Sequence, residues 1–358
     1  MEVVNNNYKH GEDDDAAVTA LAACGSYILE MVLYAAVELD IFEILSRAGD
    51  GARLSTSDIV SRLPTPAADG AAVVLDSMLK LLATHSLLIC ENIGGTERRY
   101  GIAPAGKFFA NDDGGASFCQ YLLFRPEGAS TVPRLKDVIV EGGNLSEKLY
   151  GKSYYEHLNC NAEISNKFNE AMRSHSAVLM KKVVKTYRGF EGLSCLVDVG
   201  GGTGTALATI ISKYPSIRGI NFDLPHIVNT APYYNGIEHI GGDMFVQVPK
   251  GDAILLKVRT YFILHNWSDE ACGKLLKCCY KSLPNKGKLI VMDSIMPNTT
   301  QTDIHAMYAS QMDFVMTAMF GGKERTHDEF QDLALHSGFG EFKVVSYAYG
   351  MWIMEFIK

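Results

Sequence analysis

Apolar residues recur every three or four positions through the first part of the chain, and this spacing predicts a helical N-terminal region. We expect helices over residues 17–46, 54–63 and 73–88. Two short alternating runs within 89–102 are joined by a glycine turn and predict a hairpin. Helices followed by a two-stranded wing are typical of a winged-helix domain.

The pattern changes after residue 195, where short apolar runs alternate with helical segments. The expected strands cover 195–199, 219–223, 252–257 and 288–293, and strand-like runs return over 344–357. Buried strands that alternate with helices predict a parallel α/β sheet. The stretch between the two patterns, 117–190, is expected to be mainly helical.

These two patterns predict two domains in a chain of 358 residues. The first is a winged-helix domain over 1–118, with residues 1–16 expected to be disordered. The second, over 119–358, is an α/β domain of Rossmann-like architecture. There are no internal repeats.

Charge and composition limit the partners of this fold. The sequence has 33 Lys and Arg against 41 Asp and Glu, a net charge of −8, with 47% hydrophobic and 21% charged residues. Between residues 50 and 110, six basic residues meet six acidic ones. A nucleic-acid-binding wing needs a positive surface, so we expect this domain to mediate oligomerisation and not to bind nucleic acid.

The predicted compartment is the cytosol. The first 15 residues are polar and acidic, unlike a secretory signal, and no apolar stretch approaches the ~20 residues that span a bilayer. The eight cysteines are scattered without a CxxC pair, which favours reduced, packed thiols.

A glycine-rich loop supplies the clearest chemical signal. The sequence Asp198-Val199-Gly200-Gly201-Gly202-Thr203-Gly204 joins a predicted strand to a predicted helix, and Asp223 follows 19 residues after Gly204 at the end of the next strand. Glycines let a ligand approach the main chain and the helix N-terminus. A dinucleotide fingerprint would need glycine where Thr205 stands. The D-x-G-x-G-x-G pattern is instead that of proteins that bind S-adenosylmethionine (SAM) and transfer its methyl group.

Longer strings identify a family. The segments LVDVGGGTG, SKYPSIRGINFDLPH, GIEHIGGDMF, HNWSDE and GGKERT closely resemble plant small-molecule O-methyltransferases of the caffeic-acid type. The resemblance covers nearly the whole chain after residue ~20. It implies a metal-independent enzyme, paired as a homodimer through its N-terminal domain. The positions that it assigns to SAM are Gly200, Asp223, Leu224, Asp243, Met244 and Lys257.

The resemblance also makes His265 the general base, flanked by Asp293 and Glu324. The chemistry agrees, because methyl transfer to oxygen needs an acceptor that loses its proton, and histidine is well suited to take a proton near neutral pH. His265 also lies between a predicted strand and a predicted helix, at the sheet edge where α/β sites form.

The sequence departs from the family near this base. Seven residues separate Lys257 from His265, where relatives have about three; we expect a bulge that preserves the base. Asn266 and Met319 replace an aspartate and an asparagine that bind catechol substrates in relatives, and Asp293 replaces a glutamate.

The other expected acceptor-lining residues are bulky and largely apolar: Phe124, Arg125, Tyr154, Leu158, Ile164, Phe168, Met172 and His175. We therefore expect a hydrophobic aromatic acceptor other than a simple phenylpropenoid catechol, such as a phenol of flavonoid or alkaloid type. Two alternatives stay open: N-methylation of an aromatic amine, and a non-methylating step, such as a cyclisation, with SAM bound.

Overall fold

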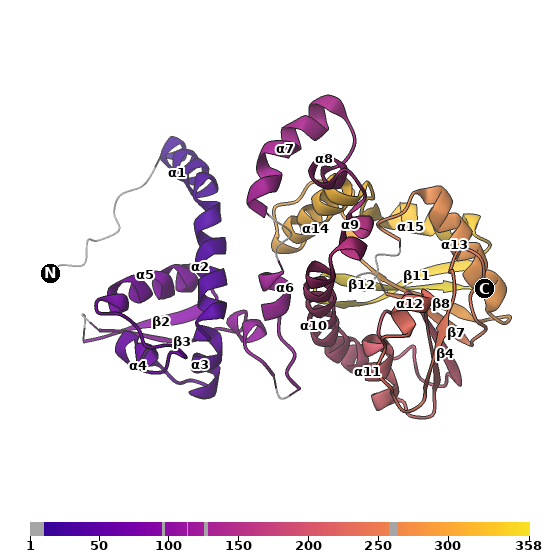
Figure 1. Ribbon diagram of the computed structural model, residues 1–358, viewed down its shortest axis with the longest axis horizontal. Coiled ribbons are helices and arrows are strands. Elements are labelled where there is room, and N and C mark those ends of the chain that lie inside the picture. Colours follow the sequence, from indigo (N-terminus) through magenta and orange to yellow (C-terminus); the bar gives the residue numbers. More distant parts are fainter. Residues whose placement is uncertain (1–10, 95–96, 113, 125–127, 258–263) are drawn as a thin grey trace. The chain divides into compact units, whose positions relative to one another are not determined.

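The computed structural model describes residues 11–94, 97–112, 114–124, 128–257 and 264–358. It divides into two compact units, Met1–Leu123 and Phe124–Lys358 (Figure 1). The division falls after helix α6 (Cys119–Leu123), which we had placed in the second domain. Cys119, Leu122 and Leu123 pack against the core of the first unit, so burial draws this helix to the N-terminal side.

The first unit is a helical layer with a small antiparallel sheet. Its elements are α1 (Glu12–Cys24), α2 (Ser26–Glu38), α3 (Ile41–Arg47), β1 (Leu54–Ser55), α4 (Thr56–Val60), α5 (Ala71–Thr84), β2 (Leu88–Ile93), β3 (Glu97–Ile102), the short 3-10 helix η1 (Gly106–Phe109) and α6. Strands β2 and β3 form the expected hairpin, and β1 extends it in the order β1-β3-β2.

Two sequence expectations for this unit need correction. The single helix expected over 17–46 is three helices, because the chain breaks at Gly25 and at Asp40, whose φ of 55° is left-handed. The expected disorder up to residue 16 is wrong for its last part, since α1 begins at Glu12 with four acidic residues in its first turn. Acidic side chains there favour a helix N-terminus. Residues 1–10 lie outside the described residues.

No single described helix is long and apolar enough to cross a bilayer. Helices α1 and α2 meet that requirement only when they are taken together, and they bend by 48° where they join.

The second unit begins with four helices, α7 (Gly128–Glu141), α8 (Leu145–Tyr150), α9 (Tyr154–Cys160) and α10 (Ala162–Thr186). The strands that follow are β4 (Cys195–Val199), β5 (Arg218–Asp223), β6 (Ile237–Gly241), β7 (Ala253–Lys257), β8 (Lys288–Asp293), β9 (Ile295–Met296), β10 (Arg325–Thr326), β11 (Glu341–Ala348) and β12 (Met351–Ile357). The later helices are α11 (Thr205–Lys213), α12 (Pro225–Val228), α13 (Asp269–Ser282), α14 (Ile304–Val315), the π-helical turn η2 (Met316–Phe320) and α15 (His327–His336).

Seven strands form the main sheet in the order β11-β12-β8-β7-β4-β5-β6. Strands β4 to β8 pair with one another in parallel, and β12 runs antiparallel to both β8 and β11. Helices α10 and α11 supply apolar residues to one face of the sheet, and α13 and α15 to the other (Figure 1). This double cover explains the continuous apolar runs of the central strands.

Candidate functional site

The strand order places a functional edge at the centre of the sheet. After β4 the chain moves outward through β5 and β6, then returns to pair β7 on the other side of β4. In open α/β sheets, ligands bind where the order reverses, beyond the carboxyl ends of the strands. The loop Gly200–Gly204 follows β4 at this point, and Lys257 ends β7.

The glycine loop is built so that only glycine fits well. Gly200, Gly202 and Gly204 have φ of 68°, 59° and 84°, which side chains rarely adopt. A Cβ added at Gly201 would lie closer than 3.0 Å to Asn221 Oδ1 and to Asp198 Cγ. The main chain of the loop therefore lies close to β5, and helix α11 begins directly after the loop.

Asp223 holds this loop from the neighbouring strand. Its Oδ2 accepts a hydrogen bond from the Gly202 amide at 2.8 Å, and its Oδ1 accepts one from the Leu224 amide at 2.7 Å. Burial raises the pKa of Asp223, while these two bonds act to lower it. A carboxylate can accept about four hydrogen bonds, so Asp223 keeps capacity for the hydroxyl groups of a ligand.

The other expected SAM residues lie along the same edge with differing exposure. Leu224 is 46% exposed. Asp243 is exposed and accepts a hydrogen bond from the Phe245 amide at 2.8 Å, whereas Met244 is half-buried against the sheet core. The expected SAM residues thus lie at or just after the carboxyl ends of β4, β5, β6 and β7, which are neighbouring parallel strands.

A buried charge cluster lies beneath the loop. Lys257 is 2% exposed, and its Nζ donates a hydrogen bond to Ser176 Oγ on α10 at 2.7 Å. Burial raises the pKa of Asp198 to about 7; the charge of Asp223 adds to this rise and that of Lys257 opposes it. Both carboxylate oxygens of Asp198 are buried without a hydrogen-bond partner among the described residues.

These features fit a nucleoside ligand that carries a positive charge. A cavity of about 210 Å³ opens between α10 and the glycine loop and is lined by Met172, Ser176, Gly201, Thr203 and Thr205, among others. The unsatisfied oxygens of Asp198 need a donor or a cation, since buried polar groups are rarely left without one. A larger cavity of about 640 Å³ lies between α13 and α15 and contains none of the expected site residues.

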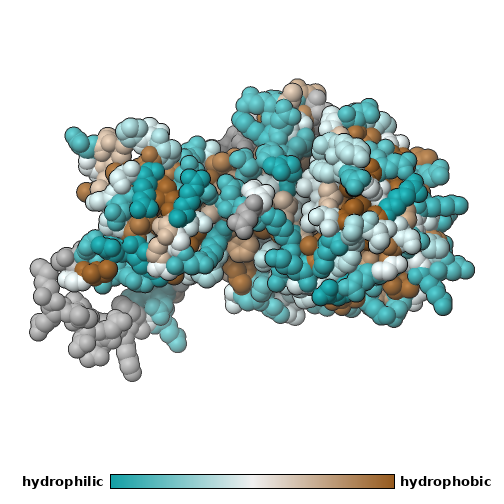
Figure 2. Space-filling view, turned by 90° about the horizontal axis from the view of Figure 1, so that it is seen from below, coloured by the Kyte–Doolittle hydropathy of each residue, from teal (hydrophilic) through white to brown (hydrophobic). Residues whose placement is uncertain are grey.

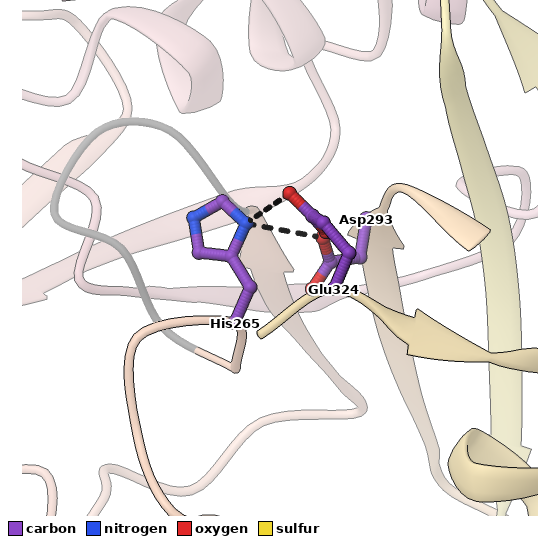
Figure 3. Close-up of side chains that lie close together, drawn as sticks. All are labelled: His265, Asp293 and Glu324. Carbon is purple, nitrogen blue, oxygen red and sulfur yellow. Dashed lines mark hydrogen bonds and ion pairs between the residues drawn. The ribbon is translucent and has the colours of Figure 1, made fainter. Parts of the chain in front are cut away.

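The three residues proposed for catalysis come together in the structure. His265 is 3% exposed, Asp293 is fully buried and Glu324 is 5% exposed. His265 Nδ1 lies 2.9 Å from Glu324 Oε1 and 3.7 Å from Asp293 Oδ1. Figure 3 shows Nε2 on the side of the ring that faces away from both carboxylates.

Strand pairing explains why two distant carboxylates meet. Asp293 ends β8 and precedes β9, and Glu324 immediately precedes β10. Strands β9 and β10 pair in parallel, with Arg325 opposite Ile295. The pairing therefore brings Asp293 and Glu324 to the same end of these two strands. An ionised Glu324 can only accept a hydrogen bond, so it selects the His265 tautomer that has its proton on Nδ1 and its lone pair on Nε2.

Several of the residues expected to bind the acceptor are aromatic and pack against one another. Phe124 and Tyr154 each contact Phe168 edge to face, at ring-centroid distances of 5.4 and 6.4 Å. Tyr154 also meets Phe320 at 5.3 Å. Leu158, Met172, His175 and Met319 are buried, whereas Ile164 and Asn266 are half-buried.

Two sequence expectations fall outside the described residues. Arg125 is one of them. The other is the bulge expected between Lys257 and His265, of which only Leu264 is described, fully buried.

Sequence reasoning missed several residues that the structure brings to the site. Ser176 on α10 and Phe320 in η2 lie outside the family strings, whereas Asn221 in β5 lies inside SKYPSIRGINFDLPH without an expected role. Arg325 lies inside the string GGKERT, which identifies its position in the family pattern but does not predict its contacts. Asp198 is the first residue of the glycine pattern, and an acid in a buried strand is itself a signal of a polar site.

Comparisons with known proteins agree with this geometry. Residues 133–340 match the O-methyltransferase domain, and residues 21–112 match the O-methyltransferase dimerisation domain. Caffeic acid 3-O-methyltransferase of Medicago sativa is 43% identical over 356 residues, covering 98% of this chain and 96% of that protein. The enzyme of the same name from Prunus dulcis is 45% identical over 353 residues, covering 97% and 95%.

Solved structures share the fold at lower identity. Human N-acetylserotonin methyltransferase in complex with SAM has a TM-score of 0.76 at 20% identity, covering 98% of this chain and 99% of that one. A methyltransferase of calicheamicin biosynthesis in its SAH-bound form has a TM-score of 0.79 at 22% identity, covering 97% and 99%.

A helical N-terminal unit and a Rossmann-like unit with a glycine loop at its switch point define a two-domain α/β protein with a ligand-binding edge. Among such proteins, this chain belongs to the O-methyltransferase family, with the family's dimerisation domain at its N-terminal end.

Proposed function

We propose that this chain transfers a methyl group from SAM to a hydroxyl group of a hydrophobic aromatic plant metabolite, without a metal ion. The observation that carries the proposal is the hydrogen bond from His265 Nδ1 to Glu324, with Asp293 beside it. The names of the relatives support O-methylation of a plant phenolic.

SAM would be held by Gly200, Asp223, Leu224, Asp243, Met244 and Lys257, and it supplies a methyl group on a positively charged sulfur. The acidic groups Asp198, Asp223 and Asp243 favour that charge at the sheet edge. Asp223 suits the ribose hydroxyls because a carboxylate accepts from both. The main chain of the glycine loop admits the ligand where side chains would block it.

His265 would act as the general base at Nε2. As the acceptor oxygen attacks, its O–H bond breaks and the proton moves to Nε2, while the new O–C bond forms and the methyl–sulfur bond breaks. The ring then carries a positive charge, which the carboxylates of Glu324 and Asp293 stabilise. Burial of all three groups strengthens this interaction, because a low-dielectric site screens charges weakly.

The acceptor would be an apolar ring system bound by Phe124, Tyr154, Phe168, Phe320 and the buried residues Leu158, Met172, His175 and Met319. A cluster of aromatic rings offers its remaining faces and edges to a flat aromatic ligand. Asn266 lacks the charge of the aspartate that it replaces, and Met319 lacks the hydrogen-bonding amide of the asparagine that it replaces. Both differences support an acceptor other than a simple phenylpropenoid catechol. Arg125 completes the proposed set.

The proposal has two further parts. The N-terminal unit pairs two copies of the chain, as its match to the dimerisation domain supports. The enzyme works in the cytosol on a small molecule and does not bind nucleic acid or membrane.

His265→Ala tests the proposed base. We expect methylation of a phenol panel by labelled SAM to fall by ~10²-fold or more, with SAM affinity unchanged. His336→Ala, on an exposed position of α15, serves as the matched control and keeps full activity. Unchanged turnover in His265→Ala would remove this residue from the mechanism. Transfer of label to amines alone would replace O-methylation with N-methylation.

A further inference from the structure

One buried cation outside the proposed catalytic set contacts the loop that carries His265. The Arg325 side chain is fully buried, and it stands next to Glu324 at the start of β10. A buried guanidinium is costly unless its N–H groups and its charge are matched by partners. The groups that hydrogen-bond to Arg325 therefore show which parts of the chain it fixes.

The side-chain hydrogen bonds described for Arg325 go to residues 264–269, the segment that contains His265 and the start of α13. Nη1 donates to the Leu264 carbonyl at 2.5 Å, and Nη2 donates to the Trp267 carbonyl at 2.9 Å. These carbonyls belong to the residue before His265 and to the second residue after it. The loop is thus held on both sides of the proposed base by one rigid group.

The same guanidinium is anchored at its other edge by Asp269, the first residue of α13. Nε and Nη2 both donate to Asp269 Oδ1, at 3.0 and 2.6 Å. Burial acts to raise the pKa of Asp269, but Arg325 and Lys323 bring it below its usual value. Arg325 therefore joins the loop, the start of α13 and β10.

Main-chain packing confirms how closely these segments fit. The Lys323 amide donates to the His265 carbonyl at 2.8 Å. A Cβ at Gly322 would lie closer than 3.0 Å to that same carbonyl. The segment 322–325 thus contacts the main chain of His265 directly, while Glu324 binds its ring.

We infer that Arg325 is a positioning residue that fixes the His265 loop against β10, so that the imidazole stays on Glu324 and Nε2 stays aimed at the acceptor. This inference rests on the proposed role of His265 as base. Only arginine suits the position, because its planar fork presents five donors in fixed directions, whereas lysine offers a single ammonium point. A displacement of a catalytic group by ~1 Å can cost about 10²-fold in rate.

Arg325→Lys in the full chain is the main test. We expect kcat to fall by ~10²-fold, with the SAM dissociation constant, measured by calorimetry, within about twofold of the parent. Arg188→Lys, in an exposed ion pair with Glu191, is the matched control and keeps the parent kcat. A kcat for Arg325→Lys within about threefold of the parent overturns the inference. Loss of SAM affinity in parallel with kcat also overturns it, since the residue would then support the whole fold.

A double-mutant cycle separates positioning from general stability. If Arg325 acts through the His265–Glu324 pair, Arg325→Lys lowers kcat by much less in a Glu324→Gln background than in the parent. If the fold loss in kcat of the double variant equals the product of the two single losses, the substitutions act independently and the inference is contradicted. Should Arg325→Lys fail to fold, Asp269→Asn removes the anchor at a 59% exposed side chain. We then expect a fall in kcat of roughly fivefold to tenfold at unchanged SAM affinity; an unchanged kcat overturns the inference.

His265→Ala, assayed beside these variants, distinguishes the two proposals. Full activity in His265→Ala means that the proposed base is wrong. Lost activity in His265→Ala together with normal activity in Arg325→Lys means that only the role of Arg325 is wrong.

Discussion

At the scale of single residues, Asp198 has the most unusual environment of the described carboxylates at the sheet edge. It lies in a buried strand, with Lys257 and Asp223 as its charged neighbours. Burial favours its neutral form, and a bound cation would favour its ionised form. Binding of a cationic ligand should therefore release the proton from Asp198. Asp198 lies against Gly201, where the loop has no room for a side chain.

Stability should depend on pH through Asp198. Its pKa is about 7 when folded, against a usual value of 3.8, so the folded state keeps a proton that the unfolded state loses. Stability from this group is complete below the unfolded pKa and is lost as pH rises through the folded pKa. Urea unfolding of the ligand-free protein should show a smaller fall in stability between about pH 4 and about pH 7 in Asp198→Asn than in the parent. Equal slopes would contradict this assignment.

Catalysis should survive removal of metal ions. The ligand atoms of His265, Asp293 and Glu324 lie within 4.8 Å of one another, close enough to hold an ion. We nevertheless expect EDTA to leave kcat unchanged, because proton transfer to His265 needs its carboxylate partners and no Lewis acid. Loss of activity in EDTA that added Mg²⁺ restores would show that the cluster is a metal site.

At the scale of elements, the sequence predicted the main sheet better than the site within it. Apolar runs identified β4, β5, β7 and β8 within a residue or two, since strands buried on both faces leave a continuous signal. Strand β6 was missed because its exposed and half-buried residues give no such run.

The site itself depends on two features that no local pattern encodes. One is the parallel pairing of β9 with β10, two strands of only two residues each. The other is the set of Arg325 contacts across about 60 positions of sequence. The family resemblance located His265, Asp293 and Glu324, but only the fold shows what brings them together.

Two glycine substitutions should have opposite effects. Gly201→Ala places a Cβ against Asn221 and Asp198, so we expect SAM affinity to fall at least ~10-fold and the protein to be less stable. Gly273→Ala meets nothing within 4 Å in helix α13, and it should stabilise by about 0.5–1 kcal/mol. Calorimetry and thermal unfolding of both variants provide the check. A Gly201→Ala protein that binds SAM normally would contradict the tight-loop argument.

At the scale of the whole molecule, the surface of the first unit suggests its role. Helices α1 and α2 expose Val18, Leu21, Tyr27 and Met31 by 56–71%. On the face shown in Figure 2, hydrophobic residues occur in small groups among hydrophilic ones. A row of large apolar side chains on successive helical turns favours contact with another protein surface.

We expect a homodimer that depends on these side chains. Light scattering should give twice the chain mass of 39.2 kDa for the parent. Tyr27→Glu combined with Met31→Glu should shift the mass toward that of one chain, because buried charge without a partner opposes association. Tyr233→Glu, at an 85% exposed position of the second unit, is the control and should stay dimeric. A parent protein of single-chain mass at micromolar concentration would contradict the dimer.

The pairing of β9 with β10 also bears on how such an enzyme can diversify. It closes a long excursion of the chain, residues 297–324, which contains α14, η2 and Met319, a proposed acceptor-binding residue. The entropy of closing a loop changes slowly with its length. Insertions or replacements early in this excursion can therefore be accommodated while the carboxylates beside His265 keep their places. Acceptor preference would then be adjustable separately from proton transfer. Laboratory evolution aimed at residues 297–312 should yield new acceptors, provided that Asp313, whose Oδ1 accepts a hydrogen bond from the Glu324 amide, is kept.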